Sequence, residues 1–169
     1  MLRRLQDHPR LLELAYQASY RLLRPFRRWL VPESRAERFL AGLERVSKRA
    51  LFDCRMCGQC ILHSTGMTCP MTCPKNLRNG PCGGVLLNGN CEILPDKPCV
   101  WVLAWERSKH MPVFGDEIVH IQAPLNNRLQ GTSAWINDFH LQQEMTPDGW
   151  VESGPVPVWS VSCVPAGSR

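Results

Sequence analysis

The chain has 169 residues, about one domain's worth, and 44% of them are hydrophobic. No apolar run approaches the ~20 residues that span a bilayer, and no secretory signal opens the chain, so we expect a cytoplasmic protein in a reducing compartment. The net charge of +5 is uneven, because residues 1–50 hold 12 Lys and Arg against 5 Asp and Glu, whereas residues 51–169 hold 8 against 10. A nucleic-acid partner is therefore not expected for the second part.

The first predicted element is an amphipathic, basic helix over about residues 8–31. Pro25 should kink or break it, because proline lacks the backbone N–H and clashes with the preceding turn. Apolar residues recur at three- and four-residue spacing, which predicts one packing face. They are Leu11, Ala15, Ala18, Leu22, Phe26 and Trp29.

A second helix is predicted over about residues 34–50. Ser34 and Glu37 have the spacing of a capping box, in which each side chain satisfies a free backbone N–H at the helix start. Its apolar face is predicted from Ala36, Phe39, Leu40, Leu43, Val46 and Ala50. Residues 1–50 are thus a helical arm, for which an anionic membrane surface, a groove on a partner and its own domain are the candidate contacts.

Glycine and proline punctuate residues 52–110 so densely that long regular elements cannot fit between them. We expect a hairpin over residues 85–93 with Asn88-Gly89 as a type I′ turn, and a short helix from Val100 to Arg107. Another short helix, capped by Thr132 or Ser133, should carry Trp135. These elements predict an α+β fold: a small, irregular, cysteine-rich domain over residues 51–140, followed by an irregular tail over residues 141–169.

Eight of the nine cysteines fall within 46 residues, and the ninth, Cys163, stands alone in the tail as a predicted free thiol. In a reducing compartment, crowded cysteines are more often metal ligands than disulfides. The eight candidate ligands are Cys54, Cys57, Cys60, Cys69, Cys73, Cys82, Cys91 and Cys99.

The strongest motif is Cys54-x2-Cys57-x2-Cys60, which favours iron–sulfur over zinc, because zinc sites usually show two separated C-x2-C pairs. Proline flanks four of the later cysteines, similar to the C-P ending of ferredoxin motifs. Eight thiolates divide into two four-thiolate sites, so we expect two [4Fe–4S] clusters. One [4Fe–4S] cluster with one four-cysteine zinc site is the alternative, and His63 is a further candidate zinc ligand.

The order of these motifs resembles the methylenetetrahydrofolate reductase C-terminal domain family. The similar segments are Leu51–Cys60, Cys69–Lys75, Asn79–Gly84, Gly89–Glu92 and Pro98–Trp101, within a resemblance over about residues 45–140. In acetogenic bacteria this family occurs as a separate small iron–sulfur subunit. The resemblance implies that the eight cysteines are cluster ligands and that the flavin and the folate site lie on a TIM-barrel partner.

The implied function is an iron–sulfur electron-transfer subunit of a methylenetetrahydrofolate reductase-type flavoprotein, in one-carbon folate metabolism, with an upstream electron donor as a second partner. The sequence contains no Rossmann glycine fingerprint and no P-loop, so we expect a non-catalytic subunit of an oxidoreductase. The alternative is a structural zinc-binding interaction module without a redox role. Both hypotheses require metal for folding.

Overall fold

The computed structural model describes residues 2–142, and the predicted tail with Cys163 lies almost entirely outside them. Four α-helices are present in this part of the chain: α1 Pro9–Leu23, α2 Arg35–Phe52, α3 Val100–Ser108 and α4 Ala134–Phe139. Short 3-10 turns join them: η1 Leu2–Asp7, η2 Arg24–Phe26, η3 His63–Thr65, η4 Pro70–Thr72, η5 Gly115–Val119 and η6 Asn127–Leu129.

The prediction of an α+β fold was wrong. Residues 2–142 are mostly helical with irregular loops, and their β structure is limited to two isolated bridges, Val85 with Cys91 and Asn90 with Pro98. The glycines and prolines between the cysteines stop each bridge from extending into a strand. The predicted division of the chain into three domains stays a prediction.

The hairpin predicted at residues 85–93 is present only as a short antiparallel pairing: one bridge, Val85 with Cys91, flanked by hydrogen bonds from the Leu86 N–H to the Asn90 carbonyl and from the Glu92 N–H to the Gly84 carbonyl. The N–H of Gly89 donates to the carbonyl of Leu86 at 2.8 Å, so the turn spans residues 86–89. A type I′ turn centred on Asn88 and Gly89 requires positive φ at both residues, but only Gly89 has it, with φ of 81°.

The boundaries of α2 and α3 agree closely with the predictions, whereas α1 ends at Leu23, well before the predicted end near residue 31. Helix α1 gives way at Arg24 to the 3-10 turn that contains Pro25, and α2 begins after the N-cap Ser34, whose Oγ accepts the N–H of Glu37 at 3.1 Å. The second half of the capping box is altered, because the Glu37 carboxylate accepts the N–H of Glu33 instead of that of Ser34. Helix α3 and the Ser133 cap of α4 are confirmed.

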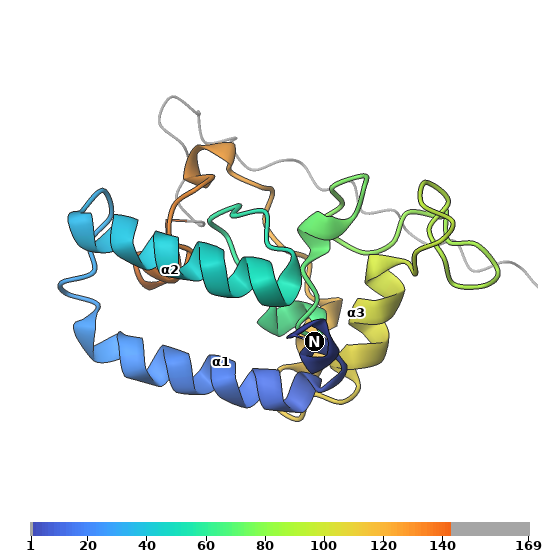
Figure 1. Ribbon diagram of the computed structural model, residues 1–169, viewed down its shortest axis with the longest axis horizontal. Coiled ribbons are helices and arrows are strands. Elements are labelled where there is room, and N and C mark those ends of the chain that lie inside the picture. The colour runs from blue at the N-terminus through green and yellow to red at the C-terminus, as the bar shows by residue number, and fades with distance from the viewer. Residues whose placement is uncertain (1, 143–169) are drawn as a thin grey trace, which may run out of the picture.

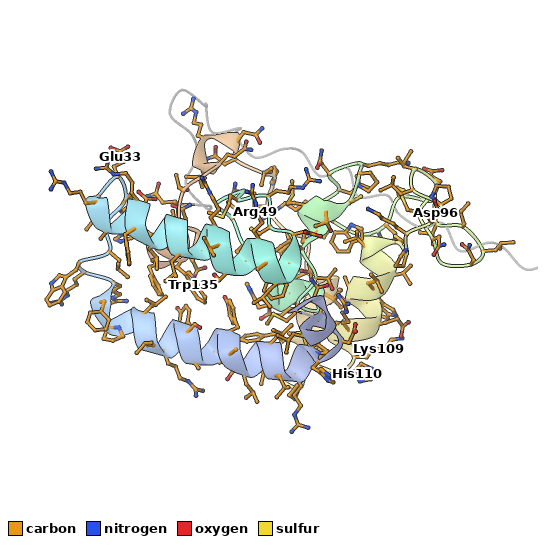
Figure 2. The ribbon with its side chains drawn as sticks, viewed as in Figure 1. Glu33, Arg49, Asp96, Lys109, His110 and Trp135 are labelled. Carbon is orange, nitrogen blue, oxygen red and sulfur yellow. The ribbon has the colours of Figure 1, made fainter. Side chains whose placement is uncertain are left out.

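Helices α1 and α2 run antiparallel, with Trp135 from the α4 segment between them (Figures 1 and 2). Tyr16 of α1 stacks on Trp135 with ring centroids 5.0 Å apart. None of the helices in residues 2–142 is long and apolar enough to cross a membrane.

The predicted packing faces of α1 and α2 were wrong, because both apolar stripes face outward. Leu11 and Leu22 of α1 are more than half exposed, and Phe39 of α2 is 77% exposed. The inward faces carry glutamates beside their apolar residues: Glu13 on α1, and Glu37 and Glu44 on α2 are all buried.

The buried glutamates are tolerated because each accepts hydrogen bonds from the domain. Oε1 of Glu13 accepts the backbone N–H groups of Val113 and Phe114 at 3.0 and 2.8 Å. Oε1 of Glu44 accepts from the Ser133 hydroxyl and from the N–H of Trp135, at the start of α4. These carboxylates therefore attach the two helices to the domain in addition to apolar contacts, in which Phe52 of α2 and Leu12 and Tyr16 of α1 pack in the core.

Candidate metal centres

The first cysteine motif begins where α2 stops. Asp53 caps the helix C-terminus in the left-handed conformation, with φ of 52°, and its N–H donates to the carbonyl of Arg49 at 3.2 Å. Met56 and Gly58 also have positive φ, at 52° and 73°. These left-handed residues curl the chain into a tight loop that carries three of the predicted ligands, Cys54, Cys57 and Cys60.

Position 58 requires glycine because the backbone of Leu129 approaches it closely. A Cβ added at this position would lie 2.0 Å from the carbonyl oxygen of Leu129, and its positive φ adds a second penalty for any other residue. The loop is thus pressed against a segment that follows it by some 70 residues.

That later segment, residues 126–137, braces the loop through four hydrogen bonds. The Gln59 amide, 1% exposed, donates to the carbonyl of Asn126 at 2.8 Å and accepts its N–H at 3.1 Å. The N–H of Gly131 donates to the carbonyl of Met56 at 2.7 Å, and the Asn137 amide donates to that of Gly58 at 2.8 Å. The loop is therefore fixed by the fold.

Four cysteines line an enclosed cavity behind this loop, which we call the enclosed site. They are Cys54, Cys57, Cys60 and Cys69. The empty space in and in front of this cavity is about 430 Å³, counting open solvent, whereas the cavity itself is about 20 Å³. Cys69 enters from just before the η4 turn, where Pro70 fixes the backbone. The structure thus identifies a fourth cysteine to accompany the three of the motif.

The thiols of the enclosed site interact electrostatically. Burial raises the pKa of Cys69 to about 12, assisted by the negative charge of Cys60 and Cys54. Burial also raises the pKa of Cys54. The N–H of Met56 donates to the Cys54 Sγ at 3.3 Å and acts in the opposite direction, to lower this pKa. Bound iron would supply the positive charge that four neighbouring thiolates need.

Two cations line the same cavity, Lys48 and Arg78. Burial acts to lower the pKa of Lys48, but the charges of Cys60 and Glu44 raise it overall, so its ammonium stays protonated. Burial lowers the pKa of Arg78, whose guanidinium donates to the carbonyl of Gln59 at 3.1 Å. A [4Fe–4S] cluster with four thiolates carries net negative charge, which these two cations would offset.

The other four cysteines line a second, larger cavity, which we call the open site. They are Cys73, Cys82, Cys91 and Cys99. The empty space is about 1970 Å³ on the same measure, and Cys54 and Cys69 also form part of its wall. The two sites are therefore adjacent.

Local turns hold the open site. The N–H of Cys91 donates to the carbonyl of Lys97 at 3.0 Å, and the N–H of Cys99 to that of Gly89 at 2.9 Å. Glu92 lies 4.0 Å from the sulfur of Cys82 and forms an ion pair with Lys75. Both members of this ion pair are partly exposed, so it contributes little to stability.

All eight cysteines are free thiols. Within residues 2–142, no three Cys, His, Asp or Glu side chains converge closely enough to hold a single metal ion. A tetrahedral zinc needs such convergence, whereas a cubane cluster spreads its four thiolates over four separate iron atoms.

His63, the candidate zinc ligand, lines neither cysteine cavity. Its ring stacks on Tyr16 with centroids 5.2 Å apart, and Nε2 lies 3.4 Å from the Glu117 carboxylate. Burial lowers the pKa of His63, although the negative charge of Glu117 acts to raise it.

Sequence reasoning missed Lys48, Arg78 and the bracing residues Gln59, Asn126 and Asn137. Of these residues, Lys48 could have been noticed from the sequence, because it lies only six residues before Cys54, on the inward side of α2. The brace gives no signal of its own, since its partners are 67 to 79 residues apart in the chain.

A family model described as methylene-tetrahydrofolate reductase C terminal matches residues 34–128. The match includes α2, both candidate sites and α3, but not α1 and not the bracing residues after position 128. No curated protein and no solved structure matches the chain.

Proposed function

Because the chain belongs to the methylene-tetrahydrofolate reductase C-terminal family, we propose that it is an iron–sulfur subunit that passes electrons to a methylenetetrahydrofolate reductase-type flavoprotein. In this proposal it carries two [4Fe–4S] clusters, and the flavin and folate sites belong to the partner. A separate protein acts as the upstream electron donor.

The observation that supports the proposal is that all eight cysteines line two adjoining cavities, four of them the first and six the second, with Cys54 and Cys69 shared. Cys54, Cys57, Cys60 and Cys69 would hold one cluster, and Cys73, Cys82, Cys91 and Cys99 the other. Each group has the number of thiolates that a cubane requires.

The neighbouring position of the two sites supports an electron-transfer role. Cys54 and Cys69 line both cavities, so two redox groups bound there would be separated by little more than these side chains. Each cluster, when bound, supplies one-electron transfer. The open site would exchange electrons with another protein, because its cavity meets solvent.

The protein's own residues would set the properties of each site. The Met56 N–H donates to the Cys54 sulfur, and Lys48 and Arg78 place positive charge beside the enclosed site. Both effects favour the more negative, reduced state and so raise the reduction potential. The brace of residues 126–137 would hold the loop in place around the cluster.

The outward face of α2 supports a protein partner. Phe39, Leu43 and Val46 are each more than half exposed and lie at i, i+4 and i+7, on one side of the helix. Exposed apolar stripes of this kind mark interaction sites. This stripe lies within the family-matched residues, as a partner interface shared by the family would.

The first experiment is analysis of iron, acid-labile sulfide and zinc in full-length protein purified without oxygen, with visible spectra before and after dithionite. About eight iron and eight sulfide per chain, with absorbance that bleaches on reduction, is the expected result. About four iron with one zinc would leave one redox site. Zinc alone, without colour, would contradict the proposal and favour the structural interaction module.

The second experiment mixes the reduced protein with a purified flavoprotein of the methylenetetrahydrofolate reductase type. Flavin bleaching within a stable complex is expected. A Leu43→Ser, Val46→Ser variant should lose the complex while keeping its iron, and Leu87→Ser, an exposed change outside α2, is the matched control. Full iron content without any flavin reduction by this partner would contradict the assigned acceptor.

A further inference from the structure

The outer surface of α1 and of the turn that follows it is apolar. Trp29 is 77% exposed, and Leu11, Leu14, Leu22, Phe26 and Val31 are each exposed as well. Phe26 and Trp29 lie together in the turn, with ring centroids 6.1 Å apart. Such a patch is costly in water unless something covers it.

The exposed charges between Pro9 and Pro32 are all positive. Five arginines of α1 and the turn are exposed: Arg10, Arg21, Arg24, Arg27 and Arg28. Glu13 is the sole acidic residue between Pro9 and Pro32, and it is 0% exposed because it accepts the N–H groups of Val113 and Phe114. The fold therefore removes the one negative charge that would have interrupted the cationic surface.

The turn lies at one end of the molecule. Figure 1 shows the connection between α1 and α2 at the opposite end from the loop around Asp96, which Figure 2 labels. The neighbours Leu94 and Lys97 of this loop line the open site. A contact made by this turn would leave the cysteine sites accessible to other proteins.

We propose that the outer face of α1 and the turn over residues 24–31, together called the arm surface, bind the interface of an anionic lipid bilayer. Leucine, phenylalanine and tryptophan would enter the boundary between headgroups and acyl chains, while the arginines contact anionic headgroups. Aromatic residues of this kind prefer that interface. The attachment is peripheral, since no described helix is able to span the membrane.

Two observations favour lipid over the flavoprotein as the occupant. The arm surface lies before residue 34, outside the family-matched residues, so a partner common to the family does not require it. Its exposed charges are of one sign, which suits a uniformly anionic surface better than a protein surface of mixed charge. This inference is independent of the metal content proposed above.

The test is co-sedimentation of the metal-loaded, full-length protein with vesicles of phosphatidylcholine alone or with about 30% phosphatidylglycerol. Binding to the anionic vesicles alone is expected, and it should weaken strongly from about 0.1 to about 0.5 M salt because the Debye length shortens. Arg24→Gln, Arg27→Gln, Arg28→Gln should weaken binding about 100-fold, from about fivefold per arginine.

Two further variants distinguish binding through the arm surface from a general effect of positive charge. Phe26→Ser, Trp29→Ser should also weaken binding, since it removes the inserted aromatic groups. Arg35→Gln, Arg38→Gln, Arg45→Gln changes three exposed arginines of α2 by the same charge and should leave binding unchanged. The proposal is overturned if both arginine sets weaken binding equally, if neutral vesicles bind as well, or if the arm arginines instead prove necessary for the flavoprotein complex.

Discussion

Each of the two candidate metal sites is assigned four cysteines, but the two sets of cysteines are held in place by different interactions. The enclosed site is built on a loop that residues 126–137 clamp through buried, long-range hydrogen bonds. The open site lies on turns joined by local hydrogen bonds and an exposed ion pair. The comparison indicates that the fold arranges the first site, whereas a metal bound at the second would have to arrange much of it.

The largest effect should come from Gly58→Val. The new side chain meets the carbonyl of Leu129 and forces an unfavourable φ, so the loop cannot close against its brace. We expect iron to fall from about eight to about four per chain, and unfolding to become easier by about 3 kcal/mol or more. Iron analysis and denaturant titration measure this.

Gly83→Ala is the matched control in the open site, since a Cβ added there would meet nothing within 4 Å and the φ of Gly83 is not positive. It should retain full iron and stability. Equal losses in both variants would mean that the two sites do not differ in rigidity.

The next effect tests the assignment of ligands. Cys57→Ser should remove the cluster of the enclosed site, and Cys82→Ser that of the open site, so each variant should keep about four iron. Their spectra after reduction should differ from each other, because each retains a different cluster. Cys163→Ser should retain all the iron.

A third prediction concerns accessibility. An iron chelator added to the oxidised protein should remove iron in two phases, with the faster phase at least about tenfold quicker, since the open site meets solvent and its turns open readily. The slow phase should be missing in Cys57→Ser and the fast phase in Cys82→Ser. A single phase in the parent protein would contradict the comparison.

The smallest effect is expected from Asn137→Ala. The variant leaves the carbonyl of Gly58 without its donor, at a cost of about 1–3 kcal/mol. The slow phase of chelation should accelerate, while the fast phase stays unchanged. The exposed Asn127→Ala, in the same segment, should alter neither phase.

The sequence predicted local features well. The Ser34 cap, the break at Pro25 and the helix after Cys99 follow from short-range chemistry that needs no tertiary information. The eight candidate cysteines were equally visible, and the family match supports the resemblance drawn from their motifs.

Features that depend on distant pairs were not predictable. Periodicity located the apolar stripes of α1 and α2 but not the direction in which they face. The buried orientation of Glu13 and Glu44 is decided by backbone N–H groups about 90 to 100 residues away. The partition of the cysteines has the same origin, because Cys69 joins the first motif only through folding.

The late position of the brace has a consequence for the order of assembly. Cys54 to Cys69 emerge from the ribosome well before residues 126–137, because synthesis runs from the N-terminus. Until those residues arrive, the loop of the enclosed site has neither Asn126 nor Asn137 to close it. If the proposed cluster is inserted during synthesis, the nascent chain would offer its thiols only during a limited interval, before the completed domain closes the loop.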